Sequence, residues 1–516
     1  MLLLGIITLV MTIPLASFYL STILIHRFAF LILLLSAVLS YNTLYVIPLS
    51  SSIGVLGGLF QTTLLSQSLE IFILILGSLI LLIVPEREEN TKNPIKSATF
   101  SNYWNKLSSK VKGVLSTSNK TYNRTELIDY PLIILFTTLG MLSLITSSDL
   151  IVMFLSIELQ SFALYILATM NRNSESAVAA GLKYFLLGGL SSCFILLGST
   201  LIYSYTGLTN FESLNIFQSI GDLSFEGVSL NYLTLGTIIL IVGLLFKIGA
   251  APLHSWAPDV YDGTPTIVTT WLTIIPKLSI LVFFIMNKFL LDPNLLLMSA
   301  LLSLLIGSIS GLAQYKIKRL LAYSTISHVG LILLSLSNDS INGLESTIFY
   351  ITQYSLTSLN TFLVIILLGY TLGKDSAISV YSPIQFISQL RGQFYKNPVL
   401  SMALSLSLFS MSGIPPLVGF FGKYYVINSA LINGNYFLSL VVVITSVMSA
   451  VYYLQIIKTL FLPDNSISVS NPENNNLSPV LAFIVAILTL FIVFFIVYPT
   501  PILNSIHLMA TCQYYF

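Results

Sequence analysis

The sequence predicts an all-α, polytopic membrane protein of about fourteen transmembrane helices. It further predicts two inverted five-helix repeats, each with one broken helix. Of the 516 residues, 55% are hydrophobic and only 8% are charged, whereas about a quarter of the residues in soluble domains are charged. The hydrophobic residues form runs of about twenty, the length that one helix needs to cross the hydrocarbon core. Few charged residues interrupt these runs, and each of them needs protein or water around it.

The transmembrane spans follow from these apolar runs. In the first half they are expected near residues 2–22, 28–49, 65–84, 128–146, 149–170, 178–205 and 231–252. In the second half they are expected near residues 264–287, 294–313, 319–337, 342–370, 397–428, 432–460 and 478–499. The N-terminus has no positively charged region and leads directly into a second apolar run, which argues against a cleaved signal peptide.

The distribution of basic residues gives an orientation. Lys and Arg gather in segments that follow odd-numbered spans, above all in the polar segment 85–127. We assign only Arg27 and Lys288 to the opposite side. Because basic loops stay on the inner side of a membrane, the basic side is the expected matrix or cytoplasmic side. Both termini are then expected on the other side.

Five ionisable residues remain inside the expected spans. Four are lysines, and Glu158 is the one acid well inside a span; the lysines are Lys183, Lys247, Lys277 and Lys423. An ionisable group at the bilayer centre costs about 2.5–3.5 kcal/mol on insertion scales, so such groups are functional candidates by default. His328 lies midway along the tenth expected span and is a further candidate, because its ring can titrate near neutral pH.

Lysine suits proton transfer because burial and neighbouring charges change its pKa, whereas arginine stays charged. Glu158 and Lys183 could form an ion pair, and a shift of that pair would change the affinity of Lys247 for its proton. A static salt bridge that fixes helix packing is the alternative. Lys277 could connect the two halves as a relay, or could be a packed lysine bonded to carbonyl groups.

Two clusters of glycine and proline predict broken helices. Gly249, Pro252 and Pro258 follow Lys247. Gly413, Pro415 and Pro416 precede Lys423. Broken helices at matching positions in two halves indicate transport sites, because their unpaired backbone groups line a hydrated cavity.

The domain organisation follows from the spacing of these breaks. They are five spans apart, and an odd number of crossings reverses direction, so the repeats must be inverted. The expected units are three N-terminal helices (1–84), a polar segment (85–127), two repeats (128–287 and 294–460) and a C-terminal helix with a tail (478–516).

Several functions are not expected from this chain. Its two cysteines, Cys193 and Cys512, are not paired with one another or with histidines at metal-binding spacings, so no metal or iron–sulfur site is predicted. It has neither a dinucleotide-binding nor a phosphate-binding glycine motif. With a net charge of only +2, the chain is not expected to have a basic surface that binds nucleic acid. Any redox chemistry is therefore expected in partner subunits.

The motifs around the buried charges resemble those of a known family, the antiporter-like, proton-pumping membrane subunits of respiratory complex I. The resemblance covers most of the chain and is carried by SIELQSFALYIL, AGLKYFLLGG, FKIGAAPLHSWAPDVYDGTPT, KRLLAYSTISHVG and SGIPPLVGFFGKYYV. It implies that Glu158 and Lys183 are a modulating pair and Lys247 the central proton carrier. It also implies that Lys277 connects the halves and that Lys423 is the distal carrier.

Within this family the sequence looks like the subunit 2 type. The subunit 4 type usually has glutamate where Lys423 stands, and the subunit 5 type has a long lateral C-terminal helix and a histidine-rich stretch that TPTIVTTWLTIIPK lacks. Fourteen spans suit a fungal or plant-like form, and the Asn-rich loops favour fungal mitochondria. The resemblance thus implies a multi-pass protein of the mitochondrial inner membrane, with both termini on the intermembrane-space side.

The resemblance also implies partners and cofactors. Other membrane and peripheral subunits of complex I are expected partners, with lipid, cardiolipin among the candidates, around them. NADH, FMN, iron–sulfur clusters and ubiquinone are expected in those partner subunits, and no cofactor is expected in this chain. Two other functions stay open at this point. One is a membrane subunit of a multi-subunit sodium/proton antiporter, and the other is a structural scaffold in which the lysines only fix helix packing.

Overall fold

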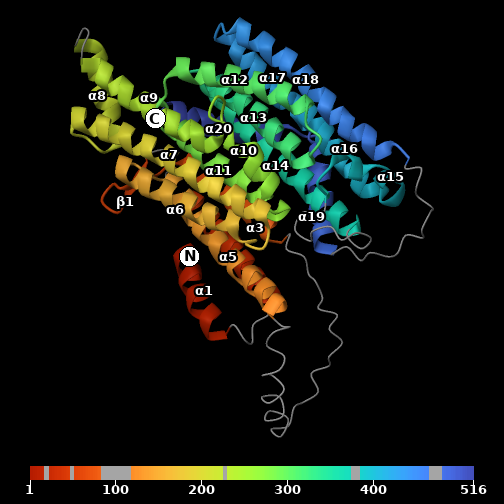
Figure 1. Ribbon diagram of the computed structural model, residues 1–516. Coiled ribbons are helices and arrows are strands. Elements are labelled where there is room, and N and C mark those ends of the chain that lie inside the picture. Colours follow the sequence, from red (N-terminus) through yellow and green to blue (C-terminus); the bar gives the residue numbers. More distant parts are fainter. Residues whose placement is uncertain are drawn as a thin grey trace.

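The computed structural model describes residues 1–16, 22–46, 52–82, 118–224, 229–372, 384–463 and 479–515. These residues form a bundle of helices that run side by side (Figure 1). In the described part of the chain, nine helices are long and apolar enough to cross a membrane, and five shorter apolar helices accompany them. The expectation of a mostly α-helical, multi-pass membrane protein is confirmed.

Three helices open the chain: α1 (Leu2–Ala16), α2 (Thr22–Val46) and α3 (Leu64–Leu81). A short antiparallel hairpin of β1 (Ile53–Val55) and β2 (Phe60–Thr62) lies between α2 and α3. The all-α prediction did not include this hairpin. Each of its strands has three residues, which is too short for the alternating pattern by which strands are recognised.

The next elements form the first half of the bundle. They are α5 (Ser118–Ile145), α6 (Leu150–Thr169), α7 (Glu175–Thr206), α8 (Phe211–Ser224), α9 (Ser229–Ile248), α10 (Trp256–Gly263) and α11 (Thr266–Met286). Helix α5 begins at Ser118 rather than near residue 128, so the end of the expected polar segment 85–127 is helical. Residues 83–117, which include the rest of that segment, lie outside the described residues.

The second half follows after the 3-10 turn η1 (Lys288–Leu290). It consists of α12 (Pro293–Leu312), α13 (Ile317–Leu336), α14 (Ile341–Leu372), the 3-10 turn η2 (Ile387–Leu390), α15 (Gln393–Lys396), α16 (Pro398–Ser412), α17 (Val418–Ile432) and α18 (Tyr436–Phe461). Helix α19 (Pro479–Phe494) corresponds to the last expected span.

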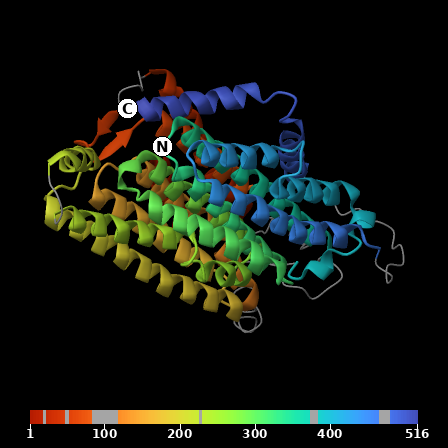
Figure 2. The same ribbon diagram turned by 90° about the horizontal axis from the view of Figure 1, so that it is seen from above.

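The expected C-terminal tail is a helix, α20 (Thr500–Tyr515), which lies along one edge of the bundle in Figure 2. The His507 ring is 2.5 Å from the carboxylate of Glu345 on α14. The Ser68 hydroxyl on α3 lies 3.4 Å from the sulfur of Met509. Helix α20 therefore connects the N-terminal group of helices to the second half.

The centre of the bundle is formed by α11, α13 and α14. In each of these three helices about nine-tenths of the residues in the apolar stretch are buried inside the protein, whereas in α7 only one-third are. Lys277 on α11 and His328 on α13 are therefore enclosed by protein. Lys183 on α7 lies at the surface of the bundle.

The structure corrects the assignment of Arg27. This residue lies near the start of α2, next to His26, whose ring stacks on Tyr130 at a centroid distance of 5.9 Å. Tyr130 is in the first part of α5, the helix that follows the basic segment. Arg27 thus lies at the end of the bundle where α2 begins, next to the first part of α5, and by the sequence pattern this is the basic side. The error was one of counting, because Arg27 follows the first span.

Helices α7 and α9 approach each other closely at glycine. A Cβ atom at Gly198 would lie 2.6 Å from the backbone nitrogen of Leu240 and 2.8 Å from the carbonyl oxygen of Gly236. A side chain there would push the two backbones apart, whereas a Cβ at Gly189 on the same helix would meet nothing within 4 Å. The fold therefore depends on the absence of a side chain at Gly198.

We expect Gly198→Ala to destabilise the protein by on the order of 1–3 kcal/mol, the usual cost of overpacking. Gly189→Ala is the matched control and should leave stability unchanged. The measurement is the thermal denaturation midpoint and the abundance of the assembled membrane complex. Equal midpoints for the two variants would contradict the close packing of α7 and α9.

Candidate functional site

Lys247 lies in the last turn of α9, directly before the first helix break. The break begins at Gly249, whose φ of +80° favours glycine. The N–H groups of Gly249 and Ala250 donate to the Leu245 carbonyl at 3.0 and 3.1 Å, which closes the end of the helix. The Trp256 indole donates to the Phe246 carbonyl at 2.8 Å. Because α9 ends here, its C-terminal dipole favours a cation at Lys247.

The partner of Lys247 is Glu158 on α6. The Lys247 Nζ is 3.3 Å from a Glu158 carboxylate oxygen. The two side chains are 9% and 16% exposed, respectively. A buried ion pair gains strength from the low dielectric around it, but removal of one partner leaves the other charge uncompensated. The pair therefore connects α6 to the end of α9 at the first break.

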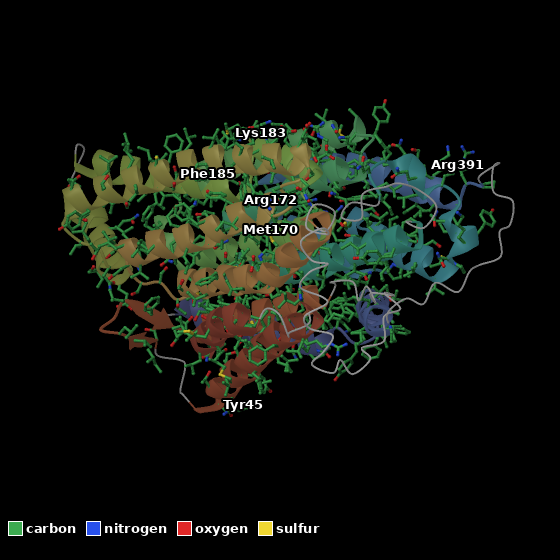
Figure 3. The ribbon with its side chains drawn as sticks, turned by 60° about the horizontal axis from the view of Figure 1, so that its bottom comes forward. Tyr45, Met170, Arg172, Lys183, Phe185 and Arg391 are labelled. Carbon is green, nitrogen blue, oxygen red and sulfur yellow. The ribbon has the colours of Figure 1, made fainter. Side chains whose placement is uncertain are left out.

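The expected ion pair between Glu158 and Lys183 is not present. Lys183 is half-exposed on the flank of the bundle (Figure 3) and pairs with Asp259 on α10 instead. The Arg319 guanidinium on α13 lies 2.5 Å from the other oxygen of the same carboxylate. Asp259 thus joins α7, α10 and α13 through two cations.

Sequence reasoning missed Asp259, although a signal was present. Asp259 and Asp262 are three residues apart on α10, and Lys316 and Arg319 are three residues apart at the start of α13. Residues at this spacing lie on one helix face. Lys316 pairs with Asp262 at 2.7 Å, next to the Arg319–Asp259 pair. The matched spacing of opposite charges predicts such a double contact.

Lys277 is almost fully buried, with 2% of its side chain exposed. Its Nζ donates to the Thr325 hydroxyl on α13 at 3.0 Å and lies 5.4 Å from the centre of the Tyr261 ring. No carboxylate pairs with Lys277 among the described residues. A hydroxyl and an aromatic face stabilise an ammonium group only modestly. The contact to Thr325 links the first half of the bundle to the second.

His328 lies in the core, between three helices of the second half. One ring nitrogen is 2.7 Å from the Tyr350 hydroxyl on α14. The other ring nitrogen is 3.1 Å from the Tyr453 hydroxyl on α18. An imidazole held at both nitrogens can take a proton on one side and release one on the other. The position expected from the sequence thus carries a hydrogen-bonded histidine.

Lys423 lies beside the second helix break. Its Nζ donates at 2.7 Å to the carbonyl oxygen of Ser412, the last residue of α16. Gly413 follows with a φ of +87°, and a Cβ there would be 2.8 Å from the Lys423 Cδ. The amine thus bridges the break from α17 to a carbonyl that α16 leaves without a helical donor.

The two predicted breaks differ in detail from the sequence analysis. Pro252 lies between α9 and α10, and Pro415 and Pro416 lie between α16 and α17. Pro258, however, is inside α10, in its first turn. Proline is tolerated in a first turn because its missing N–H has no helical acceptor there. Pro258 therefore belongs to the helix that follows the break and does not cause the break.

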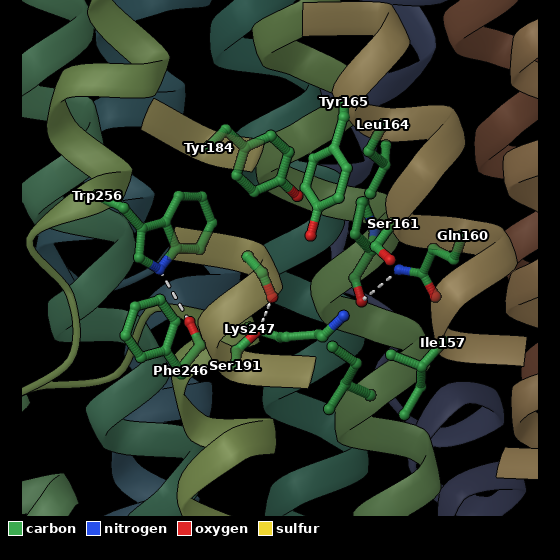
Figure 4. A pocket seen from close by; sticks show the side chains of 13 residues that line it. Ile157, Gln160, Ser161, Leu164, Tyr165, Tyr184, Ser191, Phe246, Lys247 and Trp256 are labelled. Carbon is green, nitrogen blue, oxygen red and sulfur yellow. Dashed lines mark hydrogen bonds between the residues drawn. The ribbon is translucent and has the colours of Figure 1, made fainter. Parts of the chain in front are cut away.

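A cavity of about 30 Å³ lies beside Lys247, enough for one or two water molecules. In Figure 4 the Lys247 amine points into this cavity, toward the side where Gln160 lies. Polar side chains on three helices line it, so a water there would find the partners that it needs. They are Gln160, Ser161, Tyr165, Tyr184, Ser191 and Lys247.

Further polar residues within the helices were missed, among them Gln160, Asn360 and Glu70. Gln160 on α6 is 4% exposed. Asn360 on α14 is fully buried, and neither atom of its amide bonds to a described residue. Glu70 lies within α3, and the sequence analysis overlooked it as an acid inside a span. Uncharged amides escape a search for charged residues, whereas Glu70 was detectable from its position within the run 65–84.

A model of the family described as "NADH:quinone oxidoreductase/Mrp antiporter, TM" matches residues 147–449. NADH-ubiquinone oxidoreductase chain 2 of Rhizopus oryzae is 48% identical over the whole of both chains. NADH-quinone oxidoreductase subunit N of Pelagibacter ubique is 38% identical over 74% of this chain and 78% of that protein. The family match includes Glu158, Lys247, Lys277 and Lys423.

Solved structures show the same fold. A chain of respiratory complex I from Thermus thermophilus superposes with a TM-score of 0.73 at 26% identity, and covers 98% of this chain and 99% of its own length. A chain of the Mrp complex from Dietzia sp. superposes with a TM-score of 0.76 at 20% identity, over 99% and 96%.

The chain belongs to the NADH:quinone oxidoreductase/Mrp antiporter family of membrane proteins, and within it to the group of NADH-ubiquinone oxidoreductase chain 2. The resemblance stated from the sequence motifs is therefore confirmed. The full-length relative comes from a fungus, as the composition of the loops suggested.

Asp259→Asn should destabilise the protein, because Lys183 and Arg319 would lose the carboxylate between them. These groups are partly exposed, so the expected loss is on the order of 1 kcal/mol. Asp339→Asn is the control, since Asp339 is 87% exposed and 3.6 Å from Lys288. The denaturation midpoint of the assembled Asp259→Asn variant should be lower than that of the Asp339→Asn variant. Identical midpoints would count against the Asp259 contacts.

Proposed function

We propose that this chain is a proton-translocating core membrane subunit of mitochondrial respiratory complex I. The observation that carries the proposal is a series of enclosed ionisable side chains in a member of this family. NADH oxidation and ubiquinone reduction would take place in partner subunits, which hold the FMN and iron–sulfur clusters. The chain is thus part of an NADH:ubiquinone reductase and contributes a path for protons.

The enclosed groups run through both halves of the bundle. Glu158 and Lys247 form the ion pair of the first half. Lys277 follows on the central helix α11 and contacts α13, the helix of His328. Lys423 completes the series at the second break. Four such groups would cost several kcal/mol each in lipid, so their placement around the centre supports a transport role over a scaffold.

The roles of the carriers follow from their partners. A carboxylate favours the protonated amine, so separation of Glu158 from Lys247 would promote release of the lysine's proton. Lys277 lacks a carboxylate partner among the described residues and can receive and pass on a proton without breaking an ion pair. His328 and Lys423 would carry the proton further in the second half. Lys183 would act on this series through Asp259 at the surface of the bundle.

The free energy of a pKa change at one lysine is similar to the cost of moving one proton across the membrane. Moving one charge against 100 mV costs about 2.3 kcal/mol. A change of two pKa units at one lysine corresponds to about 2.7 kcal/mol. A pKa change of this size at one lysine therefore matches the cost of one crossing.

We further propose fourteen transmembrane spans, with α9–α10 and α16–α17 each counted as one broken span. Spans four to eight and nine to thirteen would form the inverted repeats 128–287 and 294–460. In this arrangement the basic side faces the matrix and both termini face the intermembrane space. Other complex I subunits and lipid, including cardiolipin, would cover the apolar outer surface.

Lys247→Ala should lower coupled NADH:ubiquinone turnover and proton pumping by about tenfold, a barrier change of about 1.4 kcal/mol. NADH oxidation by artificial acceptors should stay normal, because it needs only the peripheral subunits. Lys396→Ala, at an exposed lysine outside the apolar helices, is the matched control. Normal pumping by an assembled Lys247→Ala complex would overturn the proposal.

Lys277→Met should have a similarly large effect, since it keeps the side-chain length but cannot hold a proton. Thr325→Val removes the acceptor of the amine and keeps the lysine, so a smaller loss is expected. For both variants, the measurement is the number of protons pumped per electron transferred to ubiquinone in membrane vesicles. Equal ratios in wild type and Lys277→Met would show that Lys277 is only a packed side chain.

A further inference from the structure

Gln160 lies between the cavity beside Lys247 and the helix that carries Lys277. It is two residues after Glu158 on α6 and is 4% exposed. Its amide nitrogen lies 3.5 Å from the carbonyl oxygen of Pro276. Its amide oxygen accepts from the Ser279 hydroxyl at 3.2 Å. Both contacts are to α11, on the turns around Lys277.

The packing around Gln160 fixes its side chain. A Cβ atom at Gly140 on α5 would lie 2.7 Å from the backbone nitrogen of Gln160, so α5 holds this part of α6 closely. The Ser279 hydroxyl, which donates to the Gln160 amide oxygen, also lies 2.9 Å from the Pro276 carbonyl oxygen, so its single proton is shared between these two acceptors. Gln160, Ser279 and the Pro276 carbonyl therefore form one closed hydrogen-bonded group at the wall of the cavity.

The hydrogen-bonded group of Gln160, Ser279 and Pro276 also lies close to Lys247, across the cavity. Gln160 and Pro276 both line it, together with Lys247. In Figure 4 the Lys247 amine points toward the side of the cavity where Gln160 lies. A water in a cavity of about 30 Å³ could bond to the lysine and to the polar atoms of this wall. No other amide side chain lines the cavity.

We propose that Gln160 is a positioning residue that holds a water beside Lys247 and thereby controls proton transfer toward Lys277. The inference rests on the proposed function. In the transfer, one N–H bond of the Lys247 ammonium breaks, and the water takes that proton while it releases one of its own, which forms a new N–H bond on the neutral amine of Lys277. Lys247 becomes neutral and Lys277 becomes charged, and nothing is oxidised or reduced. Gln160 itself neither gains nor loses a proton, because its amide only orients the water.

The test is Gln160→Leu in the assembled complex, since leucine keeps much of the volume and removes both polar atoms. We expect coupled turnover to fall about tenfold, or about 1.4 kcal/mol in the barrier. The slowing in D2O should become larger, because proton transfer then limits the rate. Gln160→Asn keeps both atoms of the amide on a side chain one methylene shorter and should restore part of the turnover. A purely structural role would leave the isotope effect unchanged.

Ser156→Ala on the same helix is the matched control. Ser156 is also buried, but its hydroxyl bonds only to the Met153 carbonyl of its own helix. Turnover and isotope effect of this variant should equal those of wild type. If Gln160→Leu behaves like Ser156→Ala while Lys247→Ala is impaired, the inference about Gln160 is wrong. If Lys247→Ala is also normal, the proposed function itself fails.

A second measurement does not depend on a variant. A map of the wild-type complex at a resolution that shows ordered water should contain a water within hydrogen-bond distance of the Lys247 amine, on the Gln160 side. A cavity without water density in such a map would overturn the inference, even if Gln160→Leu failed to assemble.

Discussion

The structure depends on the ion pair between Lys247 and Glu158. An ammonium group inside a membrane bundle needs a counter-charge or several acceptors, because burial penalises its charged form. At Lys247 the counter-charge is 3.3 Å away, and the end of α9 adds its dipole. In the proposed function, the same pair that makes the lysine tolerable also determines when it can release a proton. Under that proposal, transport depends on this contact.

Two further enclosed amines, Lys277 and Lys423, show weaker solutions of the same problem. Lys423 uses a carbonyl that a broken helix leaves free, and Lys277 uses a hydroxyl and an aromatic ring. Neither has a carboxylate partner in the part of the chain that the structure describes. The series thus runs from one strongly paired amine to two that are held by neutral groups. Neutral partners favour the charged form less than a carboxylate does, which suits the proton-passing roles proposed for Lys277 and Lys423.

Much of this arrangement can be predicted from the sequence. Apolar runs of helix length locate the helices, and lysines within them locate Lys247, Lys277 and Lys423. The glycines at the two breaks were detectable, because Gly249 and Gly413 need backbone conformations that other residues avoid. Pro258 shows the limit of this reasoning, since proline has one effect at a break and another in a first turn.

Partner choice could not be predicted in the same way. Glu158 has two lysines on neighbouring helices, and only their rotation around the helix axes decides which one it meets. A helix whose residues are apolar on all faces gives no pattern from which that rotation can be read. Lys183 consequently faces Asp259. Gln160 and Asn360 were missed because uncharged amides do not stand out within an apolar run, although they need partners as much as charges do.

The central claim is that the contact between Glu158 and Lys247 opens and closes during turnover. The most direct measurement is the distance between their side chains in maps of the complete complex, recorded at rest and during steady-state oxidation of NADH. The account predicts a second population during turnover in which Glu158 has moved away and water contacts the Lys247 amine. One unchanged distance in every state of a pumping complex would contradict it.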